Sequence, residues 1–379
     1  MITSSESDQL PSRRARIRHI VEGEEPATFA VVIMAAAWLP TAILSAIDGP
    51  PTFHAFLVDV AAQSRLLVVI PLLIVAEPWI LQRWAAIARH FLSAELIASE
   101  DQASFQGAVA AFERRRRLAV THVVLALLVY SMAVAALTNL NVGIVPTWCS
   151  GSQVMNRFSF SGASYLLISL PMMMYLVLRW MWNIFLWSWF LYTVSRMNLR
   201  LVPAHPDLMG GLGFLETSMQ GFLPFVFCIG TISAGGVANS LLHHRQPLSA
   251  FRTDALILAA FVVVICAGPL CILFDPLHRT KRRGTFEYGK FAVGLGHEFE
   301  AKWLGSSCHA DQTTLEVPDF SSTTDLFSIT ANVRQMKLVP FGVHSLARLI
   351  IVTFAPAIAV ALATVPFDTI LDRVLKLLF

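Results

Sequence analysis

The sequence predicts an all-α membrane protein, a bundle of about seven transmembrane helices with a small helical layer on the cytoplasmic side. Three observations lead to this prediction. Apolar residues make up 55% of the 379 residues and charged residues only 14%, whereas soluble globular chains carry about 25% charged residues. Seven apolar segments approach or exceed the roughly 20 residues that cross about 30 Å of hydrocarbon. Lysine and arginine are concentrated in alternate loops between these segments.

The seven predicted spans are rich in apolar residues and poor in charge. They cover residues 27–47, 65–81, 118–138, 162–192, 213–242, 254–274 and 345–365. The first is too long for the apolar part of a cleaved signal peptide, so we expect it to remain in the membrane. The second is the shortest and contains Glu77 and Pro78. The fourth is long enough to extend beyond the bilayer or to tilt strongly.

The basic residues of the loops predict the orientation. A cytoplasmic N-terminus places 20 of the 28 lysines and arginines on the cytoplasmic side and five on the opposite side. The cytoplasmic loops of membrane proteins carry such an excess of positive charge. We therefore expect the N-terminus in the cytoplasm and, with seven spans, the C-terminus outside.

The spans divide the chain into membrane and cytoplasmic parts. Three segments form the predicted cytoplasmic layer: a basic tail at 1–26, a helical hairpin at 82–117 and a helical segment at 275–344. Three segments form the membrane part: the first two spans within 27–81, the next four within 118–274, and the last at 345–365. The tail at 366–379 has apolar side chains on one helical face, and we expect it to lie along the outer interface.

Charge inside the predicted spans marks the first candidate site. Arg179 lies in an apolar run with no other charge, and a guanidinium in hydrocarbon costs at least about 2.5–3.5 kcal/mol on insertion scales. It should therefore face protein, water or an acidic partner, for which Glu77 is the best candidate. Other polar residues are expected toward the same cytoplasmic side: His122, Asn183, Glu216 and Gln220. Together these residues predict a polar vestibule open to the cytoplasm.

Three interpretations of this cluster are open. Arg179 and Glu77 form a buried ion pair that fixes helix register, or they line a conduction or substrate path, or the arginine reaches the interface and has no role. In the second interpretation, the fixed positive field of Arg179 favours an anionic solute or gates a pathway through its pairing with Glu77.

The second candidate site is the turn between the fourth and fifth spans. Its prolines prevent helix continuation, and its glycines permit positive φ and close backbone approach. Its candidate residues are His205, Asp207, Gly210 and Gly211. His205 and Asp207 could bind a metal or relay a proton, but two ligands are too few for a metal site, so no metal and no cofactor is expected. A rigid structural turn and a functional gate or ligand site are the two alternatives.

Two further patterns concern packing and partners. Gly230, Ala234 and Ala238 form a small-residue ridge, which is typical of close helix packing within the bundle or between the subunits of a homo-oligomer. The run Arg114–Arg117 precedes a span, so we expect it to bind anionic lipid headgroups of the bilayer rather than nucleic acid. The sequence shows no internal repeat, and without a catalytic motif we do not expect an enzyme.

Several motifs resemble those of one family. The turn reads Pro203-x-His205-Pro206-Asp207-x-x-Gly210-Gly211-Leu212-Gly213-Phe214-Leu215, and it is accompanied by Arg283-Gly284-x-x-Glu287-Tyr288-Gly289, Phe299-x-x-Lys302-Trp303 and Val339-Pro340-Phe341. This pattern, over most of residues 27–379, resembles a widespread family of polytopic bacterial inner-membrane proteins with no known activity. The resemblance implies a location in the bacterial inner (plasma) membrane and nothing about mechanism.

The sequence supports two main hypotheses on function. The leading one is a channel or transporter for an ion or small solute, based on the intramembrane polar residues around Arg179 and Glu77. The alternative is a membrane-embedded signalling or scaffold protein whose cytoplasmic helices, within 82–117 and 275–344, bind a partner. An intramembrane enzyme that uses His205, Asp207 or His122 is the weakest hypothesis, because no nucleophile or metal set accompanies these residues.

Overall fold

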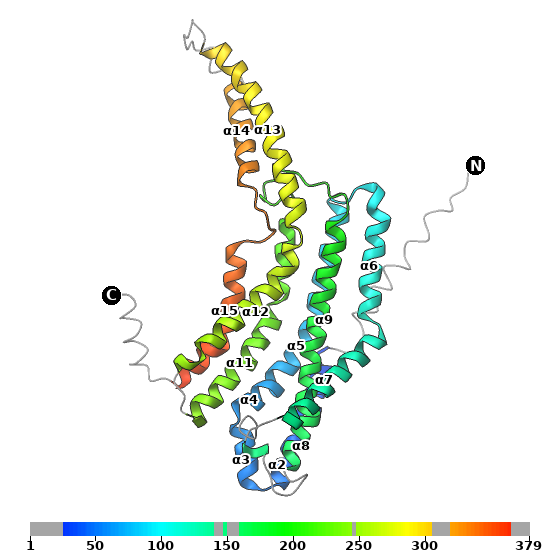
Figure 1. Cartoon of the computed structure of the whole chain (residues 1–379), viewed down its shortest axis with the longest axis vertical. Helices are drawn as coiled ribbons and strands as arrows, with labels where there is room; N and C mark the ends of the chain where they lie inside the picture. Colours follow the sequence, from blue (N-terminus) through cyan, green and yellow to red (C-terminus); the bar gives the residue numbers. More distant parts are fainter. Residues whose placement is uncertain (1–25, 140–146, 150–158, 245–247, 305–318, 365–379) are drawn as a thin grey trace, which may run out of the picture.

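The computed structural model describes residues 26–139, 147–149, 159–244, 248–304 and 319–364. Within these residues the chain consists of helices and one isolated β-bridge, so the predicted all-α class is confirmed. Most helices form an elongated bundle, and α13 (Phe274–Trp303) and α14 (Asp319–Gln335) project together from one end of it (Figure 1). We call these two helices the arm, and the two ends of the bundle the arm end and the far end. The predicted basic tail and the predicted amphipathic tail lie almost entirely outside the described residues.

The described helices include six that are long and apolar enough to cross a membrane, and a seventh candidate is a bent pair. The six crossings contain α2 (Pro26–Ile47), α5 (Ile70–Ser93), α9 (Leu170–Ser195), α11 (Leu223–His244), α12 (Arg252–Cys271) and α15 (Val343–Thr364). The bent pair consists of α6 (Gln102–Arg116) and α7 (Ala119–Asn139), which meet at an angle of 47°. The chain is therefore a multipass membrane protein.

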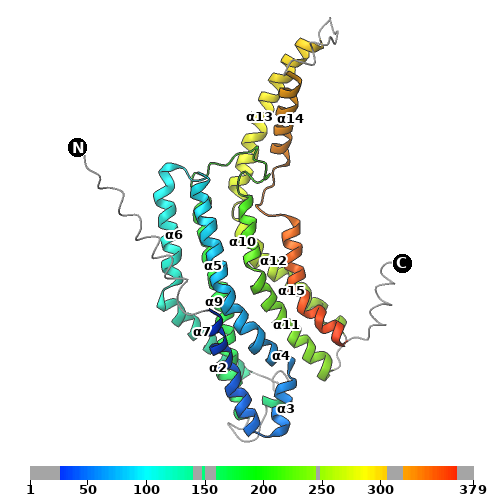
Figure 2. The ribbon, with the colours of Figure 1, turned by 180° about the vertical axis from the view of Figure 1, so that it is seen from behind.

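The bent pair must cross the bundle because its neighbours run in the same direction. Both α5 and α9 run from the far end to the arm end (Figures 1 and 2). After α5 the chain has to return to the far end before α9 can begin, and α6 with α7 makes that return. This connection supports the predicted number of seven spans.

The second span is much longer than the sequence predicted. α4 (Val60–Gln63), the π-helical segment η1 (Ser64–Val69) and α5 form one continuous helix of 34 residues, which is about 51 Å long. The fourth span, Phe160–Ser195, has 36 residues. Both helices exceed the roughly 30 Å of a hydrocarbon core, so their arm ends extend beyond it. The prediction that the second span is the shortest was wrong.

An aromatic core holds these extensions together. Trp84 of α5 stacks on Trp187 of α9, with ring centroids 5.0 Å apart and planes 2° apart. Phe105 of α6 contacts Phe91 and Phe190 at 5.8 and 5.7 Å. Such buried aromatic pairs add stability beyond the area that they remove from water. The extensions and α6 therefore form a small three-helix bundle beyond the membrane part.

The second and fourth spans share the same local build. Equivalent residues are offset by 100 positions. Each helix starts at an N-cap side chain that accepts a bond from a backbone N–H, namely Asp59 from Ala62 and Ser159 from Gly162. Each then contains a π-helical segment, η1 or η5 (Tyr165–Ser169), followed two residues later by proline. The same positions are buried in both helices: Leu66 and Leu166, Leu73 and Met173, Ile80 and Trp180, Ile87 and Trp187.

The two helices are connected at both ends. Arg65 Nη1 donates to Tyr165 Oη at 3.1 Å near the far end. At the arm end, the segments that follow the two helices pair through the antiparallel bridge Ile97–Leu199.

The small-residue ridge of α11 lies inside the bundle. A Cβ atom at Gly230 would collide with the backbone carbonyl of Thr353 in α15. Ala234 and Ala238 are each only 2% exposed within the single chain. Of the two alternatives for this ridge, the structure shows close packing within one bundle.

Candidate functional site

The first candidate site lies on the seam between α5 and α9. Arg179 Nε and Nη2 each lie 3.0 Å from Glu77 Oε1, and Asn183 Nδ2 donates to the same oxygen at 3.2 Å. The Glu77 side chain is 11% exposed and the Arg179 side chain 33%. The Glu77 carboxylate thus accepts charge-assisted contacts from the Arg179 guanidinium and a hydrogen bond from the Asn183 amide. These contacts join the two long helices.

Helical spacing explains why these side chains meet. Asn183 follows Arg179 by one turn, so both lie on the same face of α9. Close by, Trp180 Nε1 donates to the backbone carbonyl of Leu73, one turn before Glu77, at 3.0 Å. The charge of Glu77 also acts on Arg116 at the end of α6. Glu77 therefore forms an ion pair with Arg179 and interacts at longer range with Arg116.

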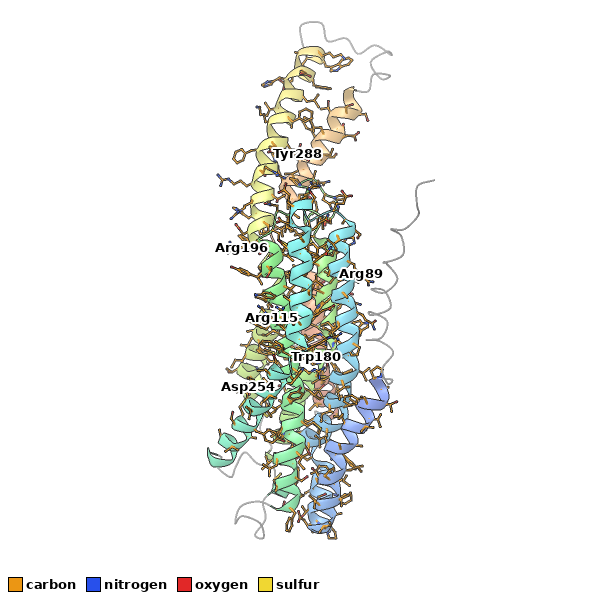
Figure 3. All side chains as sticks on the ribbon, turned by 90° about the vertical axis from the view of Figure 1, so that its right-hand side faces the viewer. Arg89, Arg115, Trp180, Arg196, Asp254 and Tyr288 are labelled. Carbon is orange, nitrogen blue, oxygen red and sulfur yellow. The ribbon has the colours of Figure 1, made fainter. Side chains whose placement is uncertain are left out.

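The cluster lies near the arm-end limit of the apolar part of the bundle. Gly221, just before α11 begins, approaches Ile80 of α5 so closely that a Cβ atom would lie 2.9 Å from Ile80 Cγ1. Glu77 is only one turn from Ile80 toward the far end. In Figure 3, Arg115 of α6 and Trp180 of α9 lie at neighbouring heights, between Asp254 toward the far end and Arg196 toward the arm end. The ion pair therefore lies between the two ends of the bundle, at the level where α6 meets α7.

The other three predicted members of the vestibule have separate partners. His122 Nδ1 lies 2.9 Å from Tyr175 Oη, and Gln220 Oε1 accepts from Arg83 at 3.0 Å. Glu216 accepts from the Gly342 backbone N–H at 3.0 Å and from the Ser345 hydroxyl. Glu216 thus caps the N-terminus of α15, where a carboxylate is stabilising. The structure brings Glu77, Arg179 and Asn183 together but not the whole predicted set.

A second polar cluster, which the sequence analysis missed, lies near the far end. The Asp59 carboxylate is buried and accepts from the Ala62 backbone N–H at 2.9 Å, Trp148 Nε1 at 2.8 Å and Asn239 Nδ2 at 2.7 Å. It joins the start of the second span to η4 (Thr147–Cys149) and α11. The signal in the sequence was a lone aspartate six residues before Arg65, both at the edge of a predicted span.

Arg65 belongs to this far-end cluster but lacks an acidic partner. Its Nη1 donates to Tyr165, and its Nε is buried without a hydrogen bond. Within the part of the chain that the structure describes, no carboxylate forms an ion pair with Arg65. A guanidinium without a direct ion pair is costly inside a membrane, which makes Arg65 a candidate for binding an anion.

An apolar stretch separates the two polar clusters. Arg65 and Glu77 are twelve residues apart on one helix, which corresponds to roughly 18 Å. The seam between them is filled by buried side chains: Leu66, Val69, Ile70, Leu73, Met173 and Leu176. The molecule therefore has two polar ends and an occluded centre along the same seam.

The turn between α9 and α11 is held by Asp207. Its Oδ1 accepts from the backbone N–H groups of Met209 at 2.8 Å and Gly211 at 3.2 Å, and its Oδ2 accepts from Gly213 at 2.8 Å. His205 Nδ1 lies 2.8 Å from Oδ1. Burial raises the pKa of Asp207, but the three backbone donors and His205 together lower it by more. The pKa therefore lies below the usual aspartate value.

This geometry favours the structural interpretation of the turn. The acceptor positions of Asp207 are used by the backbone, and they leave little capacity for a ligand. Gly210 and Gly211 have φ values of 67° and 93°, which only glycine adopts without strain. Among the described residues, no group of three or more His, Cys, Asp or Glu side chains is placed to hold a metal ion.

The turn also connects the bundle to the arm. The Lys337 backbone N–H donates to the Leu208 carbonyl at 2.7 Å, and Lys281 Nζ donates to the Met336 carbonyl at 2.7 Å. Gly284 of α13 packs so closely on Pro203 that an added Cβ atom would collide with the proline ring. The turn is thus a clamp at the base of the arm.

Comparisons with protein-family models, with curated proteins and with solved structures found no match for this chain. The interpretation of its sites therefore depends on the geometry described above.

Proposed function

We propose that the chain is a channel or transporter for a small anionic solute in the bacterial inner membrane, with a cytoplasmic N-terminus and arm. The observation that carries this proposal is a partly buried arginine at each end of the α5–α9 seam. Near the far end, Arg65 forms no ion pair within the described residues, although Asp59 lies in the same cluster, and near the arm end Arg179 pairs with Glu77. Ionisable residues kept inside a membrane despite their cost commonly mark a solute path.

The path follows the seam. An anion first meets the Arg65 guanidinium and the Tyr165 hydroxyl. Farther along, the hydroxyls of Thr41 and Ser169 lie 3.0 Å apart. Ser169 donates to the Ala37 carbonyl in this conformation, so these hydroxyls must rearrange before they can donate to an anion. The apolar stretch beyond them closes the path in this conformation. The π-helical segments supply the adaptability that opening requires, because π-bulges are often found at functional sites and distort the helical hydrogen-bond ladder.

Glu77 acts as the gate in this proposal. It neutralises Arg179 while the path is closed, and an arriving anion competes with it for the guanidinium. Weakening the pair therefore favours the open state.

Anion flux from proteoliposomes tests the proposal. We expect the wild-type protein to release chloride or phosphate, and Arg65→Gln and Arg179→Gln each to lower the flux by about tenfold or more, since charged hydrogen bonds contribute about 1.5–3 kcal/mol. Arg348→Gln, which changes an exposed arginine of α15, is the matched control and should conduct normally. If well-folded wild-type protein passes no anion, the proposal is wrong.

Glu77→Gln separates a gate from a structural pair. Loss of the buried charge should lower the free energy of unfolding by about 1–3 kcal/mol, because Arg179 loses its counter-ion. If Glu77 is a gate, anion flux per folded molecule rises at the same time; a purely structural pair changes only thermal unfolding. Glu298→Gln, at an exposed position of α13, should change neither measurement.

A signalling or scaffold function is the second candidate, and the arm is the observation that favours it. The arm projects far beyond the bundle (Figure 2), and Phe286 and Phe291 of α13 are 70% and 66% exposed. Purification of the full chain from native membranes, with and without Phe286→Ser and Phe291→Ser, tests this function. A scaffold loses a bound protein on substitution, whereas a transporter need not retain one.

A further inference from the structure

The basic run Arg114–Arg117 lies at the bend between α6 and α7. α6 ends at Arg116 and α7 starts at Ala119. α6 packs on α9 through Phe105 and Phe112, which contact Phe190, so the bend carries the four arginines to the level of the Glu77 cluster. The position of the basic run is therefore fixed by the packing of α6 on α9.

Positive charge exceeds negative charge at this surface. Arg116 is partly buried and interacts electrostatically with Glu77, Arg117 and Arg179. Glu77 Oε1 already accepts from Arg179 and Asn183. Within the described residues, the guanidinium of Arg116 forms no hydrogen bond, although it can donate five. The described part of the protein therefore supplies no hydrogen-bond acceptor for this partly buried cation.

An apolar surface begins directly below the arginines. α7 exposes a row of aliphatic side chains along its first turns: Val120 (70%), Val123 (57%), Val124 (55%) and Leu127 (66%). Such a row on a membrane-crossing helix faces lipid chains. By contrast, Arg115 covers the ring of Trp189, 3.8 Å from its centroid, as is typical of side chains at a membrane interface. The bend thus joins a cationic surface to a lipid-facing one.

We propose that this bend binds the phosphate of an anionic phospholipid headgroup. Arg116, Arg117 and Arg179 hold the phosphate, because guanidinium groups match its oxygens in paired hydrogen bonds. The acyl chains lie along the exposed face of α7. Basic residues next to a membrane span attract anionic lipids, and here Arg116 interacts with both Arg117 and Arg179. This site shares Arg179 with the proposed anion path, but lipid binding at the bend does not require that the chain transports an anion.

A free phosphate has the same headgroup chemistry, so the experiment must distinguish it from a lipid. The full chain is placed in nanodiscs of phosphatidylcholine, with or without phosphatidylglycerol, and thermal unfolding is measured. We expect phosphatidylglycerol to raise Tm by several degrees, as a ligand of the folded state does. Inorganic phosphate, added to the protein in neutral detergent, should give little or no shift. A phosphate shift as large as the lipid shift would overturn the lipid assignment.

Charge-matched variants assign the effect to the bend. Arg116→Gln with Arg117→Gln should lose most of the lipid-dependent shift, and Arg116→Lys with Arg117→Lys should retain much of it. The control, Arg282→Gln with Lys290→Gln, removes the same charge from exposed positions of the arm and should keep the full shift. If the double glutamine variant does not fold, the exposed Arg117→Gln alone should show a reduced shift. An unchanged shift in the bend variants overturns the proposal.

Discussion

Asp207 shows how one carboxylate can determine the path of a whole turn. Three backbone N–H groups converge on it within seven residues, and two of them belong to glycines. A Cβ atom at Gly213 would lie only 3.0 Å from Asp207 Oδ2, so a larger residue there would disturb the same contact. At this position, the residue type and the backbone conformation depend on each other.

The lowered pKa of Asp207 makes the turn sensitive to acid. Because the pKa is lower in the folded state, the ionised carboxylate adds stability at all pH values above its unfolded pKa of about 3.9, and that stability is lost as the pH falls through the folded pKa. We expect Asp207→Asn to lower the free energy of unfolding by about 1–3 kcal/mol at pH 7. Thermal unfolding of both proteins between pH 7 and pH 3 measures the difference, which should shrink below about pH 4.

The control for Asp207 is Asp325→Asn, because Asp325 is exposed on α14. This variant should match the wild-type protein at every pH. A difference between Asp207→Asn and the wild-type protein that persists unchanged at pH 3 would contradict the linkage to ionisation.

The sequence predicted some residue contacts and not others for physical reasons. Glu77 and Arg179 each lie in an apolar segment, so mutual compensation was the expected solution and the structure contains this pair. The environment of Arg65 depends instead on the register of two π-helical segments, which hydropathy does not encode. Glu216 was assigned to the vestibule by depth, but its direction toward the N-terminus of α15 is a tertiary property.

At the scale of helices, α11 and α15 form the closest contact in the bundle. Gly230 permits it, because the backbone of α15 occupies the space that a side chain would need. Close approach of this kind replaces hydrophobic burial as the source of helix association in lipid. The contact therefore depends on the absence of a single methyl group.

Two glycines of α11 provide a matched comparison. Gly230→Ala should destabilise the protein by about 1–3 kcal/mol, since extra atoms in a packed contact force the backbone apart. Gly236→Ala adds the same methyl group where no atom lies within 4 Å, and alanine favours helix, so it should not lower stability. Thermal unfolding of the two variants in detergent checks this. Equal loss of stability in both would show that helix contact is not the cause.

The underestimated length of the second span also has a cause at this scale. Hydropathy falls after Leu81, where Gln82 and Arg83 follow. The helix continues because Trp84, Ile87 and Phe91 keep helical spacing and are buried against α6 and α9. Hydropathy identifies only the part of a helix that lies in lipid. Beyond that part, this helix continues because its apolar side chains pack against other helices.

At the scale of the whole molecule, the same direction of α5 and α9 determines the path of the chain. It requires a return through α6 and α7, and it places the arm and the start of α12 at opposite ends of the bundle. Figure 3 shows this separation in the positions of Tyr288 and Asp254. The fold class and most spans followed from the sequence, because lipid imposes a simple rule on length and polarity. The π-helical segments that the second and fourth spans share did not, because hydropathy does not encode them.

Labelling from both sides of the membrane tests the predicted orientation. In a background in which the exposed Cys271 and also Cys308 are replaced by serine, an impermeant thiol reagent should label Asp254→Cys in intact cells. Asp325→Cys on the arm should react only in inverted membranes or after lysis, because basic loops stay in the cytoplasm. The reverse pattern would place the arm outside, and labelling of both from one side would contradict a membrane crossing by α12.

The clamp at Gly284 and Pro203 makes the arm a mechanical amplifier. From Gly284 to Trp303, α13 continues for roughly 30 Å. A tilt of about 10° at the clamp would therefore move the far end of the helix by roughly 5 Å, although the contacts at Pro203 would shift by only a fraction of that. The turn that contains Pro203 directly follows α9. A small rotation of α9, one that leaves its aromatic contacts intact, would therefore move the tip of the arm far enough for another protein to detect.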